Sequence, residues 1–185
     1  NAIAFTIGNY GYVGTGQSKD DKQTKDFYRF DPTAPSGSQW SIVNGFGGQK
    51  RTGGLSFIID NVAYIVGGTN NGQDVTDFWK FDPSTESWTQ LRDISDSSDE
   101  DYDDDYTITR TNGVAFVIDG AAYLTCGESG SLRSDTWKYY PATDLWENVA
   151  KFKGTARTAT ASFSSGEKGF VVSGKSGTTQ FDDIW

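Results

Sequence analysis

One segment of this chain occurs four times, and that repetition constrains the possible fold more than any other feature. The clearest copy runs from Arg51 to Leu91 and contains Phe57, Tyr64 and Gly68 at characteristic positions. The matching residues of the other copies are Phe5, Tyr12 and Gly16, then Arg110, Phe116, Tyr123 and Gly127, then Arg157, Phe163, Phe170 and Gly174. Units of roughly 50 residues are typical of propeller or solenoid proteins.

The second half of the unit repeats as well. It reads Asp-Phe-Trp-Lys-Phe-Asp-Pro at 77–83 and is matched at 26–32 and 135–141. Its tryptophans and the ones that follow it are Trp40, Trp79, Trp88, Trp137 and Trp146. We therefore expect a single domain over 1–185, divided into repeat 1 (1–48), repeat 2 (49–107), repeat 3 (108–155) and a truncated repeat 4 (156–185).

Apolar residues alternate with other residues along each short segment, which indicates β-strands. In the second copy Leu55, Phe57 and Ile59 share one face, and Asp60-Asn61 marks the turn that follows. Pro83 ends the third strand, because proline cannot donate a hydrogen bond to a sheet. The pattern predicts an all-β protein in which each repeat is a four-stranded antiparallel sheet, as in a propeller blade.

A glycine recurs at the end of the second strand. The residue pairs there are Thr15-Gly16, Gly67-Gly68, Cys126-Gly127 and Ser173-Gly174. Only glycine adopts positive φ at low cost, so we expect the second position to have the unusual backbone and the first to need only a small side chain. Cys126 is accordingly predicted to be a buried small residue and not a nucleophile, since the chain contains no histidine to activate it.

These residues resemble the kelch signature. Tyr64 to Gly68, Trp79 to Pro83 and then Trp88 match it closely, and residues 12–16 and 157–163 resemble kelch repeats of bacterial envelope and secreted proteins. The resemblance implies a kelch-type β-propeller of the galactose-oxidase-like superfamily, with one blade per repeat. It does not imply a reaction, because most kelch propellers are binding platforms and function does not follow from the fold alone. The expected location is extracellular, periplasmic or cell-surface.

Three complete copies and one partial copy would make a short propeller, since known propellers have about 4–8 blades. We therefore expect these residues to form an incomplete part of a six- or seven-bladed ring.

The net charge of −9 argues against nucleic-acid binding, which depends on Lys and Arg side chains that neutralise phosphates. No apolar run approaches the length of a membrane span. Eight acids lie within 93–105, in a link that is longer than those between the other repeats. This acidic insertion lacks the Gly and Glu of an EF-hand, so we predict a solvated acidic loop, with a weak cation site or a site for a basic partner as the alternative.

Loop length distinguishes the two faces of the predicted propeller. The loops between second and third strands are long, at 17–25, 69–76, 128–134 and 175–182, and the links between repeats emerge on the same side. We call this side the long-loop face. The opposite face has minimal turns. Because binding residues concentrate on loops held by a rigid scaffold, we predict that the long-loop face binds the ligand.

Three arginines, Arg51, Arg110 and Arg157, begin the innermost strands near the expected channel mouth. One interpretation is structural, with each guanidinium capping carbonyls or pairing with an acid. The other is a ring of guanidinium groups that binds a carboxylate or sugar acid. Glu128 is the single acid whose position suggests a catalytic role.

Catalysis has little support in the sequence. Without histidine, the chain cannot form His-based zinc sites, Ser–His or Cys–His pairs, or the copper site of galactose oxidase. The leading hypothesis is a non-enzymatic propeller that binds a protein or glycan through the long-loop face, without metal or cofactor. The alternative is a carbohydrate-active enzyme, similar to the sialic-acid epimerases, with its site at the channel mouth.

Overall fold

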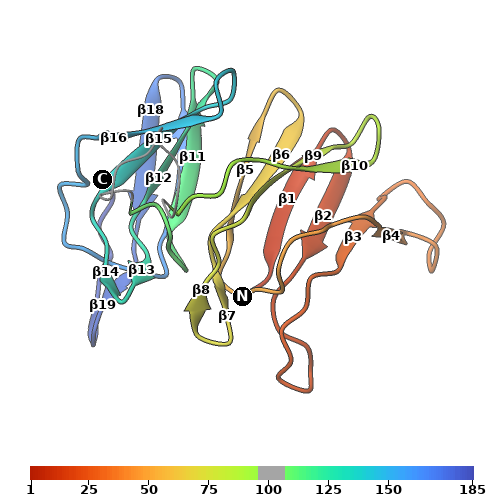
Figure 1. Ribbon diagram of the computed structural model, residues 1–185, viewed down its shortest axis with the longest axis horizontal. Coiled ribbons are helices and arrows are strands. Elements are labelled where there is room, and N and C mark those ends of the chain that lie inside the picture. Colours follow the sequence, from red (N-terminus) through yellow and green to blue (C-terminus); the bar gives the residue numbers. More distant parts are fainter. Residues whose placement is uncertain (96–106) are drawn as a thin grey trace.

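The computed structural model describes residues 1–95 and 107–185, and its regular elements there are all β-strands (Figure 1). No helix long and apolar enough to cross a membrane occurs within these two ranges. Three successive four-stranded antiparallel sheets stand side by side, and a two-stranded sheet follows them.

Each sheet comes from one repeat, and its strands are joined to their neighbours in chain order. The first sheet contains β1 (Ile3–Ile7), β2 (Tyr10–Gly14), β3 (Phe27–Phe30) and β4 (Trp40–Val43). The second contains β5 (Leu55–Ile59), β6 (Val62–Val66), β9 (Phe78–Asp82) and β10 (Ser87–Gln90). The third contains β11 (Val114–Ile118), β12 (Ala121–Thr125), β15 (Thr136–Tyr140) and β16 (Leu145–Val149), and the fourth contains β17 (Ala161–Ser165) and β18 (Lys168–Val172). We call these sheets blades 1 to 4.

Small hairpins extend from three blades within the long loops, a feature that the sequence pattern did not predict. They are β7 (Thr69–Asn70) with β8 (Gln73–Asp74), β13 (Glu128–Ser129) with β14 (Ser131–Leu132), and β19 (Lys175–Ser176) with β20 (Thr179–Gln180). In blade 1 the same loop is closed by a bridge between Gln17 and Gln23. Figure 1 shows these loops at its lower edge and the short turns at its upper edge.

The tight turns between first and second strands have the backbone that their residues predict. Asp60 and Asn61 have φ of 50° and 62°, and Asp119 and Gly120 have φ of 50° and 72°. Two consecutive positive φ values define the type I′ hairpin turn, whose twist matches that of the strands. The register is thereby fixed, and Phe57 pairs with Tyr64 as Phe116 pairs with Tyr123.

The Asp-Pro turns between third and fourth strands are stabilised by the side chain of their own aspartate. Asp82 Oδ1 accepts hydrogen bonds from Ser84 N at 2.8 Å and Ser84 Oγ at 2.6 Å, and Asp31 Oδ1 accepts the equivalent bonds from Thr33. The hydrogen bond from the hydroxyl is the main cause that lowers the pKa of each carboxyl below its usual range. An aspartate at this position therefore fixes the turn.

Adjacent blades pack through aromatic side chains. Each blade has a stacked cross-strand pair of rings, and in blades 1 to 3 this pair contacts the following blade. The pairs are Phe5–Tyr12, Phe57–Tyr64, Phe116–Tyr123 and Phe163–Phe170, with centroids 4.8–5.7 Å apart. Between blades 2 and 3, Tyr64 contacts Tyr139 and Phe78 contacts Trp146 at centroid distances of 5.5 Å each. Such pairs stabilise the stack beyond the area that they bury.

The tryptophans at equivalent positions of the repeat differ in how far they are buried. Trp79 and Trp88 of blade 2 pack against Phe46 at centroid distances of 5.6 and 4.7 Å, while Trp137 and Trp146 of blade 3 are buried against blade 2. Trp40 is instead 57% exposed, because it lies on the face of blade 1 that points away from blade 2.

The predicted acidic insertion at 93–105 falls mainly on residues 96–106, which lie outside the described residues. The two ends of this link are described. Ile94 and Ile108 are fully buried, and a bridge joins Ser95 to Thr107. The chain therefore leaves and re-enters the core at adjacent points.

Candidate functional site

A buried arginine begins each of blades 2 to 4 and bonds several parts of its own repeat. Arg110 Nε donates to Ile108 O at 2.9 Å, and Arg110 Nη1 donates to Cys126 O and to Asp135 O, both at 3.2 Å. Its Nη2 donates to Asp135 Oδ2 at 2.6 Å. One side chain thus connects the start of the first strand, the end of the second and the start of the third.

Arg51 and Arg157 have the same arrangement. Arg51 Nε and Nη1 donate to Gln49 O and Gly67 O, and Nη2 pairs with Asp77. Equivalent bonds run from Arg157 to Thr155 O at 2.9 Å, to Ser173 O at 3.0 Å and to both carboxylate oxygens of Asp183. The Arg157 guanidinium also lies 3.9 Å from the Phe181 ring centroid.

These three arginines are inside the protein. They are 0%, 0% and 1% exposed for Arg51, Arg110 and Arg157. Burial lowers the pKa of Arg51 and of Arg110, and the aspartate beside each arginine opposes that shift. The geometry favours the structural interpretation of this set, since every guanidinium has carbonyl and carboxylate partners. Ligand binding by these arginines stays a prediction.

The arginine backbone connects each blade to the preceding one. The carbonyl oxygens of Arg51, Arg110 and Arg157 accept hydrogen bonds from the amides of Gly16, Gly68 and Gly127, at 2.7, 2.8 and 2.8 Å. A Cβ at Gly68 would lie 2.8 Å from Thr52 O, and one at Gly127 would lie 2.7 Å from Thr111 O. The repeated glycine is thus required both by its φ of 84–107° across the four blades and by this close approach.

The expectation for the residue before that glycine was incomplete. Thr15, Gly67, Cys126 and Ser173 also have positive φ, between 57° and 65°. Small size is therefore not the sole requirement there. A φ of 57–65° lies in the left-handed region, which non-glycine residues can adopt at some cost. The φ of the glycine that follows lies beyond this region.

Cys126 is confirmed as a buried residue. It is 0% exposed, and burial is the main cause that raises the pKa of its thiol to about 11. A thiol with so high a pKa carries little thiolate at neutral pH, so it is not poised as a nucleophile.

A second line of inter-blade bonds follows the inner strands. Gly53 N donates to Asn1 O, Asn112 N donates to Gly53 O, and Ala159 N donates to Asn112 O, at 3.0, 2.8 and 3.1 Å. The hydroxyls of Thr111 and Thr158 donate to the same carbonyls, of Gly53 and Asn112, at 3.2 Å each. The inner edge of the stack is therefore a continuous hydrogen-bonded rim.

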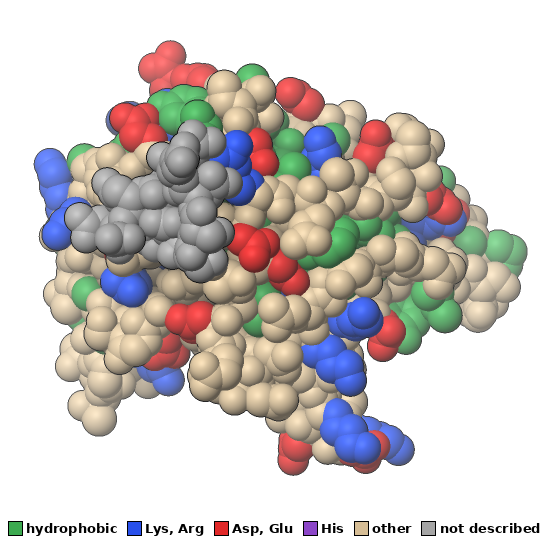
Figure 2. Space-filling view, in the orientation of Figure 1, with side chains coloured by type: hydrophobic (Ala, Val, Ile, Leu, Met, Phe, Trp, Pro, Cys, Tyr) green, Lys and Arg blue, Asp and Glu red, His purple; other side chains and the backbone are tan. Residues whose placement is uncertain are grey.

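The long-loop face is formed by the hairpins, and neighbouring loops bond to one another. Asn71 N donates to Gln23 Oε1 at 2.8 Å, and Ser129 Oγ donates to Asp74 Oδ2 at 2.5 Å. These bonds join blade 1 to blade 2 and blade 2 to blade 3. Figure 2 shows charged side chains of both signs gathered at the projecting lower edge. The loops thus form one polar surface on a fixed framework.

Glu128 lies on this face, where it is half-buried in β13. Its backbone forms a bridge with Thr111, with N–O distances of 2.9 and 3.0 Å. In the part of the chain that the structure describes, no group of three or more His, Cys, Asp or Glu side chains is placed to hold a metal.

Four-stranded antiparallel sheets stacked side by side, with their first strands adjacent at the inner edge, are the blades of a β-propeller. A family model described as the KLHDC2/KLHL20/DRC7 Kelch-repeats domain matches residues 1–174. The chain therefore belongs to the kelch-repeat family, and the expected fold class is confirmed.

The structure of YjhT is among the solved structures that this chain resembles, and it superposes with a TM-score of 0.73 and 20% sequence identity over 94% of this chain. The chain spans 58% of the length of that protein. At this identity the likeness shows the fold alone. Among curated proteins, no sequence matches this chain.

Proposed function

We propose that this chain is a non-enzymatic binding module whose long-loop face binds a protein or a glycan. The observation that supports the proposal most strongly is the continuity of that face. Three hairpins and the 17–23 loop project on the same side, and hydrogen bonds connect the loops of blades 1 and 2 and those of blades 2 and 3. Kelch propellers are generally used for binding, which agrees with this arrangement.

The chemistry of the hairpins suits a polar ligand. Asn71, Gln73, Ser131, Thr179 and Gln180 are exposed on them. Amide and hydroxyl groups both donate and accept hydrogen bonds, as the hydroxyls of a glycan or the backbone of a peptide require. Because loops are held at both ends by strands, ordering them on binding costs less than ordering a free segment.

The epimerase-like alternative is less favoured by the geometry. It requires guanidinium groups that face the channel mouth, whereas Arg51, Arg110 and Arg157 bond to carbonyls and aspartates of their own repeats.

We also propose that binding takes place outside the cell, in the periplasm or at the cell surface. The support is the resemblance of residues 12–16 and 157–163 to repeats of secreted and envelope proteins. Detection of the native protein in separated cell fractions tests this, and recovery in the cytosolic fraction alone would contradict it.

The binding proposal is tested by probing immobilised glycans and purified extracellular proteins with the purified chain. A variant with Gln73→Ala and Gln180→Ala removes exposed amides from two hairpins. The control, Glu167→Ala with Lys168→Ala, changes the turn between β17 and β18 on the opposite face. We expect the hairpin variant to bind at least about 10-fold more weakly and the control to bind as the wild type does. Loss of binding in the control alone would contradict the proposal.

A further inference from the structure

A polar pocket of about 270 Å3 lies where the outer strands of blade 1 meet blade 2. Its lining residues are Arg29 of β3, Ser41, Ile42 and Val43 of β4, Asn44 directly after them, and Glu86 of the turn between β9 and β10. None of these residues belongs to the hairpins of the long-loop face. The pocket therefore lies outside the surface where we propose that a protein or glycan binds.

An ion pair between the two blades forms one wall of this pocket. Arg29 Nη1 donates to Glu86 Oε1 at 2.8 Å, and the Arg29 guanidinium lies 5.0 Å from the centroid of the Tyr10 ring. Ser41 is the cross-strand partner of Arg29, so both side chains are on the face of blade 1 that points toward blade 2. A guanidinium, a carboxylate and a hydroxyl therefore converge on one space.

Much of the hydrogen-bonding capacity in the pocket is unused. A guanidinium has five N–H donors, and a carboxylate accepts through both oxygens. Within residues 1–95 and 107–185, Arg29 Nε and Nη2, Glu86 Oε2 and the side chains of Ser41 and Asn44 form no hydrogen bond. The side chains of Arg29 and Glu86 are 33% and 66% exposed, so a ligand can reach both.

The equivalent groove between blades 2 and 3 is closed by bonds of the protein itself. Asp144 occupies the position of Glu86 there, and it accepts hydrogen bonds from Arg92 N at 3.1 Å and from Tyr139 Oη at 3.0 Å. Asn44 is equivalent to Arg92, since each is the fourth residue after the tryptophan of its outer strand. No hydrogen bond joins Asn44 to Glu86 in the described ranges. The groove between blades 1 and 2 therefore keeps a carboxylate oxygen available to a ligand.

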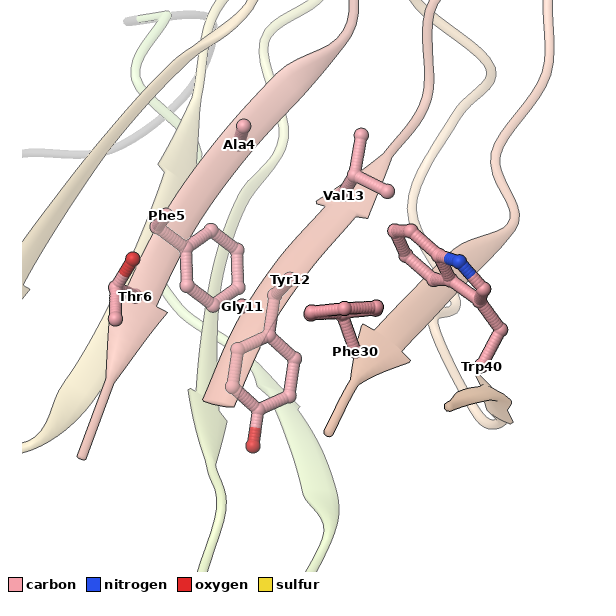
Figure 3. Close-up of a pocket in the computed structure, with 8 residues that line it drawn as sticks. All are labelled: Ala4, Phe5, Thr6, Gly11, Tyr12, Val13, Phe30 and Trp40. Atoms are coloured by element: carbon pink, nitrogen blue, oxygen red, sulfur yellow. The ribbon is translucent and has the colours of Figure 1, made fainter. Parts of the chain in front are cut away.

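Size and charge restrict the class of ligand. Pockets for drug-sized ligands measure about 300–1,000 Å3, so a pocket of about 270 Å3 suits a smaller molecule. The opposite charges of Arg29 and Glu86 compensate each other, which favours a neutral ligand over an ion. By contrast, the larger hollow beside Phe30 and Trp40 has no charged side chain in its lining (Figure 3).

We propose that this pocket binds a single neutral sugar unit, whose adjacent hydroxyls bond to Arg29, Glu86 and Ser41. Each sugar hydroxyl both donates and accepts, so a guanidinium, a carboxylate and a hydroxyl can bond to neighbouring hydroxyls at the same time. Val43 adds an apolar surface for the C–H groups of the sugar ring.

Titration of the full chain with D-glucose, D-galactose and D-mannose, followed by nitrogen–proton correlation NMR, tests the proposal. We expect saturable changes of chemical shift for at least one of these hexoses, centred on the amides of residues 41–44 and of Glu86. The absence of saturable changes for all three hexoses would overturn the proposal. Changes centred on the hairpins of the long-loop face would overturn it as well.

Variants of the lining residues test which groups hold the sugar. Arg29→Ala is expected to weaken hexose binding at least about 10-fold and Ser41→Ala about 2- to 10-fold, because hydrogen bonds to charged groups are the stronger ones. Lys80→Ala is the matched control, since Lys80 has the position of Arg29 in blade 2, and it is expected to bind as the wild type does. Unchanged affinity of Arg29→Ala, or equal weakening by Lys80→Ala, would contradict the proposal. The spectra themselves show that each variant is folded.

The hairpin variant, Gln73→Ala with Gln180→Ala, separates this pocket from the proposed function of the long-loop face. It is expected to bind the hexose as the wild type does, because neither glutamine lines the pocket. Loss of hexose binding in this variant would place the sugar on the hairpins and overturn the proposal. Because the pocket binds the hexose whether or not the long-loop face binds a ligand, failure of either proposal is observed separately.

Discussion

The buried arginine of each repeat is the residue on which the blade geometry most depends. Its guanidinium bonds to carbonyls at two strand ends and to an aspartate, so three segments of one repeat share a single side chain. Its carbonyl oxygen bonds to the preceding blade. A residue that looks from sequence like a candidate for ligand binding therefore joins segments both within and between blades.

Replacement of Arg110 by alanine is expected to lower the free energy of unfolding by about 3–5 kcal/mol, because it leaves the largely buried Asp135 carboxylate without its cationic partner. Urea unfolding measures the change. Arg29→Ala is the control, since Arg29 pairs with Glu86 at the surface and such pairs contribute at most about 1 kcal/mol. Equal stability of Arg110→Ala and the wild type would contradict the structural role.

Ala159 tests the backbone of the inner rim. Its φ of 54° is unfavourable for alanine, so Ala159→Gly is expected to raise the free energy of unfolding by up to about 1 kcal/mol. In the matched control, Ala161→Gly in β17, the free energy of unfolding is expected to decrease by about 0.5–1 kcal/mol, because glycine weakens a strand. Equal destabilisation of both variants would contradict the expectation that Ala159 is strained by its positive φ.

At the scale of elements, the repeat predicts most of the strands, and the reason is physical. Alternating apolar residues identify β5 and β11, and the turns at Asp60 and Asp119 need the residues that tolerate positive φ. The hairpin strands within the long loops are missed because two-residue strands contain no alternation. The left-handed backbone at Cys126 is missed because nothing in a cysteine signals it.

The candidate site was less predictable than the strands. The sequence shows that three arginines, Arg51, Arg110 and Arg157, occupy equivalent positions. The direction of each guanidinium, however, depends on an aspartate more than twenty residues later in the chain, namely Asp77, Asp135 and Asp183. The side-to-side bonds of the long-loop face, such as Ser129 with Asp74, join different repeats and leave no periodic signal.

Asp183 anchors the last described segment of blade 4 to the sheet. Its carboxylate accepts bonds from Arg157 and from Trp185 Nε1, next to the bridge between Val172 and Ile184. The Arg157 hydrogen bond, then that of Trp185, lowers the pKa of Asp183 to about 2. An aspartate in the unfolded chain has a pKa of about 3.9.

The folded-state pKa lies below the unfolded value, so the stabilisation is complete above about pH 4 and is lost as the pH falls toward about 2. We therefore expect the stability difference between the wild type and Asp183→Asn to shrink over this range. Urea unfolding at a series of pH values measures it. A difference that stays constant from pH 4 to 2 would show that Asp183 is not held by Arg157.

At the scale of the whole molecule, the blades form one stack through two kinds of contact. Aromatic pairs pack each blade on the next, and backbone bonds join the inner edges. The same repetition fixes the loops on one side, where we propose the ligand binds.

Amide hydrogen exchange measured by NMR tests this account of the stack most directly. Gly16, Gly68 and Gly127 donate to the arginine carbonyl of the following blade, whereas no blade follows Gly174 within the described residues. We predict exchange at least about 100-fold slower at the three bonded glycines than at Gly174. Equal rates at all four positions would contradict the stacking of the blades described for this chain.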